Sequence, residues 1–194
     1  MELTQEVENK IKGIALGYME KSRPDWNVPH FYTAAFYMKV LIKNEGGSPK
    51  VLLPAIYLHD IGYAGLLSKG YTYNDNQKVK KDHMIIGADI SKQILNEVGS
   101  FTDDEISQII RLISIHDNLA EIKGHEAQLV FEADSLAQID FDKVKPNFDK
   151  ESYFKWLDYF KEKRVPLFKT KTGRDFLKSL LLKAEYYYGE NNKT

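Results

Sequence analysis

Apolar residues recur at helical spacing along almost the whole chain, and this periodicity is the feature that most constrains the fold. After Thr102, for example, Ile106, Ile109, Ile110 and Ile113 return every three or four residues, which places them on one face of an α-helix. Runs in which apolar and polar residues alternate, as in a half-buried strand, are absent from the sequence. We therefore predict an all-α fold with no substantial sheet.

Capping residues, glycines and prolines divide this periodicity into a bundle of about seven helices. Thr102-Asp103-Asp104-Glu105 has the form of a capping box, and Gly46-Gly47 and Gly99 are typical helix stops. A helix is expected to follow from Pro29, because proline suits the first helical position, where its missing N–H needs no partner. Counted one by one, the predicted helical segments are eight: 4–20, 30–45, 49–58, 82–98, 103–116, 126–139, 149–163 and 173–188.

Composition limits the chemistry further. The chain has 194 residues, 43% of them hydrophobic, which is enough for one domain with a sizeable core. It has no cysteine, so a metal ion would have to be bound by His, Asp or Glu. The N-terminal stretch is acidic and no apolar run is long enough to cross a bilayer, so we expect a cytoplasmic protein with no membrane partner.

The formal net charge of −1 gives no reason to expect a nucleic-acid polymer as partner. The charge is unevenly distributed, because residues 143–194 hold 13 Lys and Arg against 7 Asp and Glu. Such a basic region is typical of a solvated helix surface, and it also fits attraction of an anionic substrate. The sequence leaves both interpretations open.

Four histidines and two aspartates stand out because they lie at the ends or in apolar stretches of the predicted helices. His59 and Asp60 end an apolar run, and Asp134 lies among apolar residues. An unpaired carboxylate in such a place costs on the order of several kcal/mol, which a bound cation offsets. The candidate metal ligands are His30, His59, Asp60, His83, His116 and Asp134.

These six groups are enough for one or two divalent ions, among which Mn, Fe, Co, Ni, Zn and Mg are candidates. Asp60 is the natural bridge between two ions, because His59 can bind one ion while the two oxygens of Asp60 reach both. This position also makes Asp60 a candidate catalytic residue. We expect Gly62 to end the helix and so to leave room for the ions.

The candidate ligands occur in an ordered set of motifs. These are His30, then His59-Asp60-Ile61-Gly62, His83-Met-Ile-Ile-Gly87-Ala88, Ile-Ser-Ile-His116 and Phe-Glu-Ala-Asp134-Ser-Leu. Over about residues 22–140 the set resembles the HD-domain superfamily of metal-dependent phosphohydrolases, and most of all its small stand-alone bacterial and archaeal members. The resemblance implies a helical bundle in one HD-type domain over residues 1–194, with C-terminal helices at 149–188 packed on it.

The resemblance also implies roles for the individual residues. His30, His59, Asp60 and Asp134 would bind a first ion, and His83 and His116 a second, with Asp60 shared. The implied reaction is hydrolysis of a phosphate ester or anhydride in a small phosphorylated substrate by metal-activated water.

Further residues near these motifs are candidates for the same reaction. Lys80, Lys81 and Arg111 are candidate substrate contacts, because the phosphate charge needs cations. Asp117 is a candidate catalytic residue, either as a proton carrier or as the group that orients its neighbour in the chain.

The chain departs from the pattern of its apparent relatives at two positions. Many of them carry Arg where it has Thr33, and several carry Lys where it has Tyr63, while His125 matches no ligand position. Two alternative functions also stay open: an HD-fold di-iron oxygenase, which uses the same ligands, and a catalytically silent metal-binding HD module. The substrate, the metal and the oligomeric state do not follow from the sequence.

Overall fold

The computed structural model describes residues 3–67, 71–147 and 149–190, which form eight α-helices with no strand among them. The predicted all-α bundle is confirmed. The helices are α1 Gln5–Met19, α2 Pro24–Glu45, α3 Pro49–Leu58, α4 Tyr73–Val98, α5 Asp103–Ile115, α6 His125–Ile139, α7 Lys150–Tyr159 and α8 Lys171–Glu190. Short 3₁₀ turns lie at Ile61–Tyr63, Leu119–Glu121 and Val165–Leu167, and a π turn at Phe160–Arg164.

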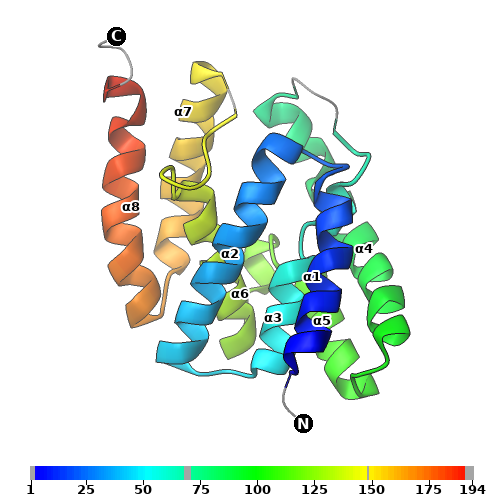
Figure 1. Cartoon of the computed structure of the whole chain (residues 1–194). Helices are drawn as coiled ribbons and strands as arrows, with labels where there is room; N and C mark the ends of the chain where they lie inside the picture. The colour runs from blue at the N-terminus through cyan, green and yellow to red at the C-terminus, as the bar shows by residue number, and fades with distance from the viewer. Residues whose placement is uncertain (1–2, 68–70, 148, 191–194) are drawn as a thin grey trace.

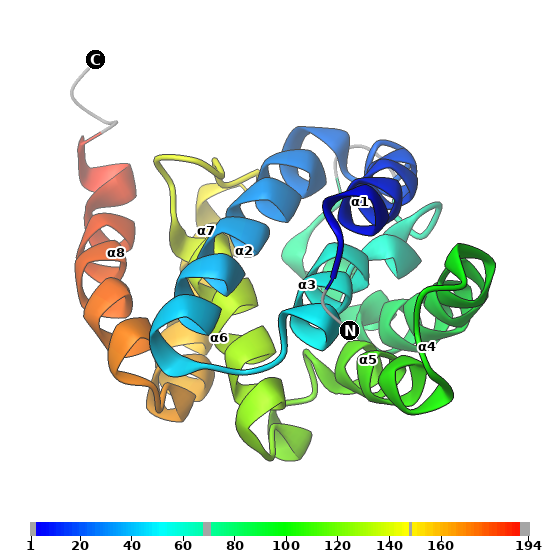
Figure 2. The same cartoon turned by 60° about the horizontal axis from the view of Figure 1, so that its bottom comes forward.

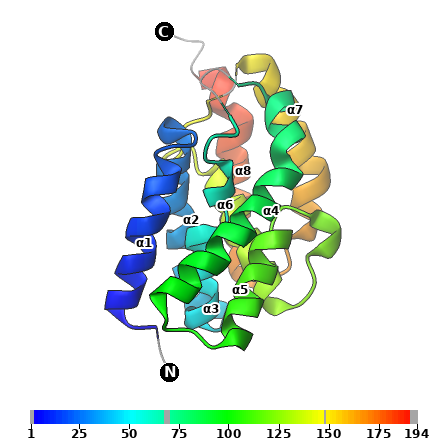
Figure 3. The same ribbon diagram turned by 90° about the vertical axis from the view of Figure 1, so that its right-hand side faces the viewer.

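The helices pack around one main apolar core. Helices α2, α3 and α6 lie in the middle, with α7 and α8 on one side and α1, α4 and α5 on the other (Figures 1 and 2). Figure 3 shows α4 and α5 running side by side. The core includes Phe160, Leu177 and Leu180, so the C-terminal segment packs on the bundle, while the single-domain organisation of residues 1–194 stays a prediction. Within the described residues, none of the helices has the length and hydropathy that a membrane span requires.

Several helix ends form as predicted, because local contacts are sufficient to define them. Thr102 and Glu105 form the capping box at the start of α5, through hydrogen bonds of 2.8 and 3.2 Å. Thr4 caps α1 by accepting a hydrogen bond from the N–H of Val7. Helix α4 ends at Gly99, whose φ of 70° lies in the left-handed region that favours glycine.

The predicted start of α2 is wrong. The helix begins at Pro24, so Pro29 lies inside it and not at its first position. The ring of Pro29 removes the N–H that would bond the carbonyl of Asp25, and packing of α2 against α6 and α3 outweighs this loss. Thr33 donates its hydroxyl to the Pro29 carbonyl at 2.8 Å, which gives that side chain a local structural role.

Helix α4 also begins earlier than the predicted position near Asp82. Its N-terminus is a second capping box, in which Thr72 and Asp75 exchange hydrogen bonds of 3.1 and 3.2 Å. The polar sequence that follows this box has little apolar periodicity, so the box was not recognised. The longer helix places Lys80 one turn before His83, on the same face.

Candidate metal centre

The six predicted metal ligands come together inside the bundle, where all are at most 5% exposed. They come from α2 (His30), the two residues that follow α3 (His59 and Asp60), α4 (His83), the residue that follows α5 (His116) and α6 (Asp134). Elements far apart in the sequence therefore contribute to one cluster.

The first ligand set consists of His30, His59, Asp134 and one oxygen of Asp60. His30 Nε2 lies 3.1 Å from Asp134 Oδ1 and 3.2 Å from His59 Nε2, and His59 Nε2 lies 3.5 Å from the same Asp134 oxygen. Asp60 Oδ2 lies 3.6 and 3.8 Å from the two nitrogens. Bonds of about 2.1 Å to one ion place neighbouring ligand atoms roughly 3.0 Å apart at right angles and roughly 3.4 Å apart in a tetrahedron. The distances among His30, His59 and Asp134 are close to these values, and those to Asp60 are a few tenths of an ångström longer. His30, His59 and Asp60 form a group that could hold a metal ion.

The second ligand set consists of His83, His116 and the other oxygen of Asp60. The two Nε2 atoms lie 3.2 Å apart, and Asp60 Oδ1 lies 3.7 Å from His83 Nε2 and 3.6 Å from His116 Nε2. The two oxygens of Asp60 thus face different pairs of histidines, which is the arrangement of a bridging carboxylate.

Backbone hydrogen bonds orient one histidine in each set. His59 Nδ1 donates to the carbonyl of Ile56 at 2.8 Å, and His116 Nδ1 donates to the carbonyl of Ile113 at 2.7 Å. Because a carbonyl only accepts, each ring carries its proton on Nδ1 when neutral and turns the lone pair of Nε2 toward the cluster. This is the tautomer that metal-binding histidines use.

Gly62 has a different role from the one we expected. A Cβ at this position would lie 2.0 Å from the carbonyl oxygen of His83 and 2.6 Å from the nitrogen of Gly87. The motif glycine therefore makes room for the backbone of α4 and not for ions. It allows α4 to approach close enough to bring His83 to Asp60.

The carboxylates of the cluster stay ionised although burial opposes this. Burial raises the pKa of Asp60, but His59 and other cationic groups hold it well below its usual range. Burial acts in the same way on Asp134, whose pKa is held well below its usual range by hydrogen bonds with His30 and His59. Burial lowers the pKa of His59, but Asp60 and Asp134 outweigh it and raise the pKa to about 9. A divalent ion would replace this compensating proton, so metal binding should release it.

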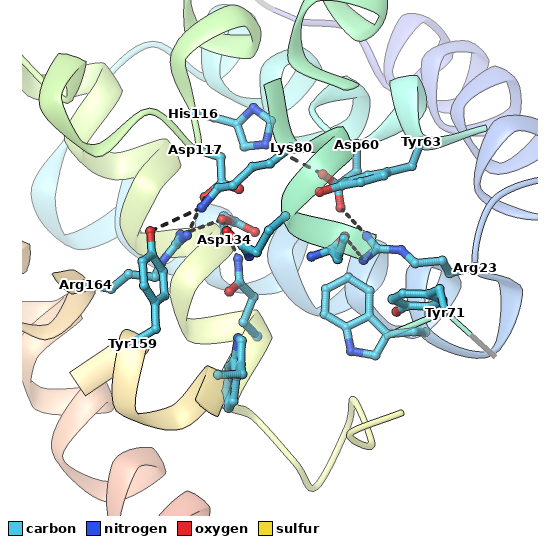
Figure 4. A pocket seen from close by; sticks show the side chains of 15 residues that line it. Arg23, Asp60, Tyr63, Tyr71, Lys80, His116, Asp117, Asp134, Tyr159 and Arg164 are labelled. Carbon is cyan, nitrogen blue, oxygen red and sulfur yellow. Dashed lines mark hydrogen bonds and ion pairs between the residues drawn. The ribbon is translucent and has the colours of Figure 1, made fainter. Parts of the chain in front are cut away.

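A cleft opens beside the ligand cluster (Figure 4). It contains about 550 Å³ of empty space, counted out to its open mouth and including open solvent. The cluster contributes Asp60, His116 and Asp134 to its wall. Three cationic side chains also line the cleft: Arg23, Lys80 and Arg164.

Arg164, from the π turn after α7, is 2% exposed. Its two Nη atoms donate to Asp117 Oδ1 at 2.6 Å and to Asp134 Oδ2 at 2.7 Å, and its Nε donates to Ser135 at 3.0 Å. Arg164 binds Oδ2 of Asp134, while Oδ1 faces His30 and His59 in the first ligand set. Sequence reasoning missed this residue, since its only signal was the basic character of residues 143–194.

Arg23 was missed as well, because it precedes the first recognised motif. It is 7% exposed, and its Nη2 lies 3.5 Å from Asp60 Oδ2. Its Nε donates to Asn27 at 2.6 Å. The guanidinium also lies 4.4 Å from the ring centre of Trp26, which fixes it at the edge of the cluster.

Of the predicted substrate contacts, the structure brings Lys80 to the cleft and leaves Lys81 and Arg111 outside it. Lys80 Nζ lies 3.2 Å from Asp117 Oδ1 and donates to the hydroxyl of Tyr159 at 3.3 Å. Lys81 and Arg111 are exposed and do not line the cleft, because neighbouring positions on a helix point about 100° apart. Asp117 lines the cleft, and its catalytic role stays a prediction.

Comparison with known proteins supports the family and adds no named relative. No match was found among curated proteins or among solved structures. The family model described as "HD domain" matches residues 28–139, which is more than half of the 194-residue chain and spans all six clustered ligands. The chain therefore belongs to the HD domain family.

Proposed function

We propose that the protein is a metal-dependent phosphohydrolase, which cleaves a phosphate ester or anhydride bond in a small phosphorylated substrate. The observation that carries the proposal is Asp60, whose two oxygens face two pairs of histidine Nε2 atoms beside a cation-lined cleft. Membership of the HD domain family supports the reaction class. The proposed cofactor is one or two divalent ions, bound by imidazole and carboxylate groups that suit Mn, Fe, Co, Ni and Zn.

In the proposed reaction, the divalent ions and the protein side chains have different roles. Divalent ions at the cluster would polarise a phosphoryl oxygen and lower the pKa of water. The protein supplies position and charge, which dominate catalysis of phosphoryl transfer. Arg23 and Lys80 add positive charge at the cleft wall, and Arg164 holds Asp134 in its ligand orientation.

The charged side chains that line the cleft lie close together, so one small phosphoryl group could contact several of them. Asp117 pairs with both Lys80 and Arg164, at 3.2 and 2.6 Å. A phosphoryl group that entered between them would compete with this carboxylate for the same cations. We therefore expect phosphate binding to loosen the contacts of Asp117.

The test is metal analysis coupled to a hydrolysis assay. Protein purified without chelator should contain about one or two divalent ions per chain, and should hydrolyse at least one member of a panel of nucleotides and sugar phosphates with Mn²⁺, Co²⁺ or Ni²⁺. Asp60→Asn should lose bound metal and reduce turnover at least about 100-fold, because it removes the shared charge. His125→Ala is the matched control, since this histidine is exposed and lies outside the cluster.

Two results would contradict the proposal. Bound iron with oxygen consumption and no phosphate release would favour the di-iron oxygenase. Stoichiometric metal without hydrolysis or oxygen consumption would favour a catalytically silent module.

A further inference from the structure

Tyr63 is a buried side chain that the proposed reaction has not used. It lies in the 3₁₀ turn that follows Asp60 and is 4% exposed. Its ring stacks on the ring of His83, with centroids 3.9 Å apart and planes 12° from parallel. The guanidinium carbon of Arg23 lies 4.1 Å from its ring centre. These contacts fix the ring beside the second ligand set.

The hydroxyl of Tyr63, in contrast, has no hydrogen-bond partner among the residues that the structure describes. The side chain lines the cleft. Figure 4 shows it reaching past Asp60 toward the middle of the cleft, on the side of Lys80 and Asp117. This oxygen is not one of the fully buried atoms that lack a partner, so it is reachable from the cleft. A fixed phenol with a reachable, unpartnered hydroxyl can donate to a group bound in that cleft.

We propose that the Tyr63 hydroxyl donates a hydrogen bond to a phosphoryl oxygen of the substrate, next to the second ligand set. The inference rests on the proposed function, which defines the ligand as a phosphoryl group. A phenol is a donor at neutral pH, and a hydrogen bond to an anionic oxygen is about twice as strong as one between neutral groups. Tyr63 thus adds a directional contact to the positive charge of Arg23 and Lys80, and it is a substrate-binding residue.

The test compares two tyrosine variants in Mn²⁺-loaded protein. Tyr63→Phe keeps the ring contacts and removes only the hydroxyl. Tyr37→Phe is the matched control, because the hydroxyl of Tyr37 is buried and donates to Asp140 at 2.8 Å, away from the cleft. Calorimetric titration with Mn²⁺ and then with inorganic phosphate measures the two affinities, and thermal melting measures stability.

Tyr63→Phe should bind Mn²⁺ and melt like the wild type, but bind phosphate about 10- to 100-fold more weakly, as expected for a lost hydrogen bond to a charged group. Tyr37→Phe should melt at a lower temperature and bind phosphate like the wild type. Equal phosphate affinity in Tyr63→Phe and wild type would overturn the inference, as would no phosphate binding by the metal-loaded wild type. Loss of Mn²⁺ affinity in Tyr63→Phe would also overturn it, because the hydroxyl would then act on the metal site.

The same measurements separate this inference from the proposed function. Wild-type protein that binds phosphate through Tyr63 but hydrolyses no ester or anhydride would refute the proposed function and leave the inference intact. Hydrolysis that Tyr63→Phe leaves unchanged, with unchanged phosphate affinity, would refute the inference alone.

Discussion

Replacing Gly62 by Ala tests whether close backbone packing assembles the second ligand set. The new Cβ would lie 2.0 Å from the His83 carbonyl oxygen, whereas a carbon and an oxygen in favourable contact are about 3.3 Å apart, so α4 must move by roughly 1.3 Å. The obstacle is backbone, which cannot rotate away as a side chain can. We expect Gly62→Ala to destabilise the fold by about 3 kcal/mol, the upper part of the usual range for overpacking.

The same movement should weaken the second ligand set more than the first. His83 belongs to α4, and its Nε2 lies 3.7 Å from Asp60 Oδ1. Metal–ligand distances tolerate deviations of only about 0.2 Å, so a shift of α4 should prevent the second set from binding an ion. The first set should keep its ion, because His30 and Asp134 come from other helices.

Gly87→Ala is the matched control in the facing helix. A Cβ there would meet the nitrogen of Gly62 at 3.4 Å and the carbonyl oxygen of His59 at 3.6 Å, which are ordinary contacts. Since alanine also favours a helix interior by about 0.5 to 1 kcal/mol over glycine, this variant should be neutral or slightly stabilised. Urea unfolding gives both free energies, and Mn²⁺ titration gives the number of bound ions. Gly62→Ala with the stability and the number of bound ions of the wild type would refute the reasoning.

Three further predictions concern charge and metal. Burial opposes ionisation of Glu8, but hydrogen bonds from two lysines and Tyr57 lower its pKa to about 2, below the ordinary 4.5. Its contribution to stability is therefore complete above pH 4.5 and lost as the pH falls toward 2, so Glu8→Gln should cost about 2 kcal/mol at pH 7 and progressively less in acid. A difference that does not depend on pH, in urea unfolding from pH 7 to 3, would contradict this. Arg164→Gln should destabilise the fold by about 3 kcal/mol, because it removes the buried cation that Asp134 and Asp117 share, and should weaken Mn²⁺ binding; unchanged binding would show that Arg164 does not position Asp134. Removal of metal by a chelator should lower the melting temperature, and Mn²⁺ at 100 times its dissociation constant should restore about 2.7 kcal/mol of stability. Identical melting with and without metal would contradict metal binding to the native state.

The mismatches between prediction and structure share a physical cause. Pro29 looked like a helix start because proline favours that position, yet tertiary packing extends α2 to Pro24. Lys81 and Arg111 are cations near the ligand motifs in sequence, but they lie on the outer faces of their helices. Proximity in sequence gave no information about the direction of these side chains.

Local patterns in the sequence were enough to predict the helical fold and to name the six candidate ligands that cluster in it. Helical periodicity and caps such as the pair Thr102 and Glu105 depend on residues three or four apart, and these interactions are present in any helical segment. The order of the histidine and aspartate motifs predicted the six residues that converge. Sequence reasoning also predicted that Asp60 is shared between two ions, and the folded chain shows its two oxygens facing different pairs of histidines. Metal binding by this carboxylate stays a prediction.

Only the tertiary structure decided what surrounds this cluster. Arg164 reaches Asp134 from a turn 30 residues further along the chain, and Arg23 reaches Asp60 from before the first motif. Gly62 matters because α4 approaches its backbone. Each of these contacts depends on how separate helices pack, and helix packing is set by the summed burial of many side chains, which no short sequence pattern contains.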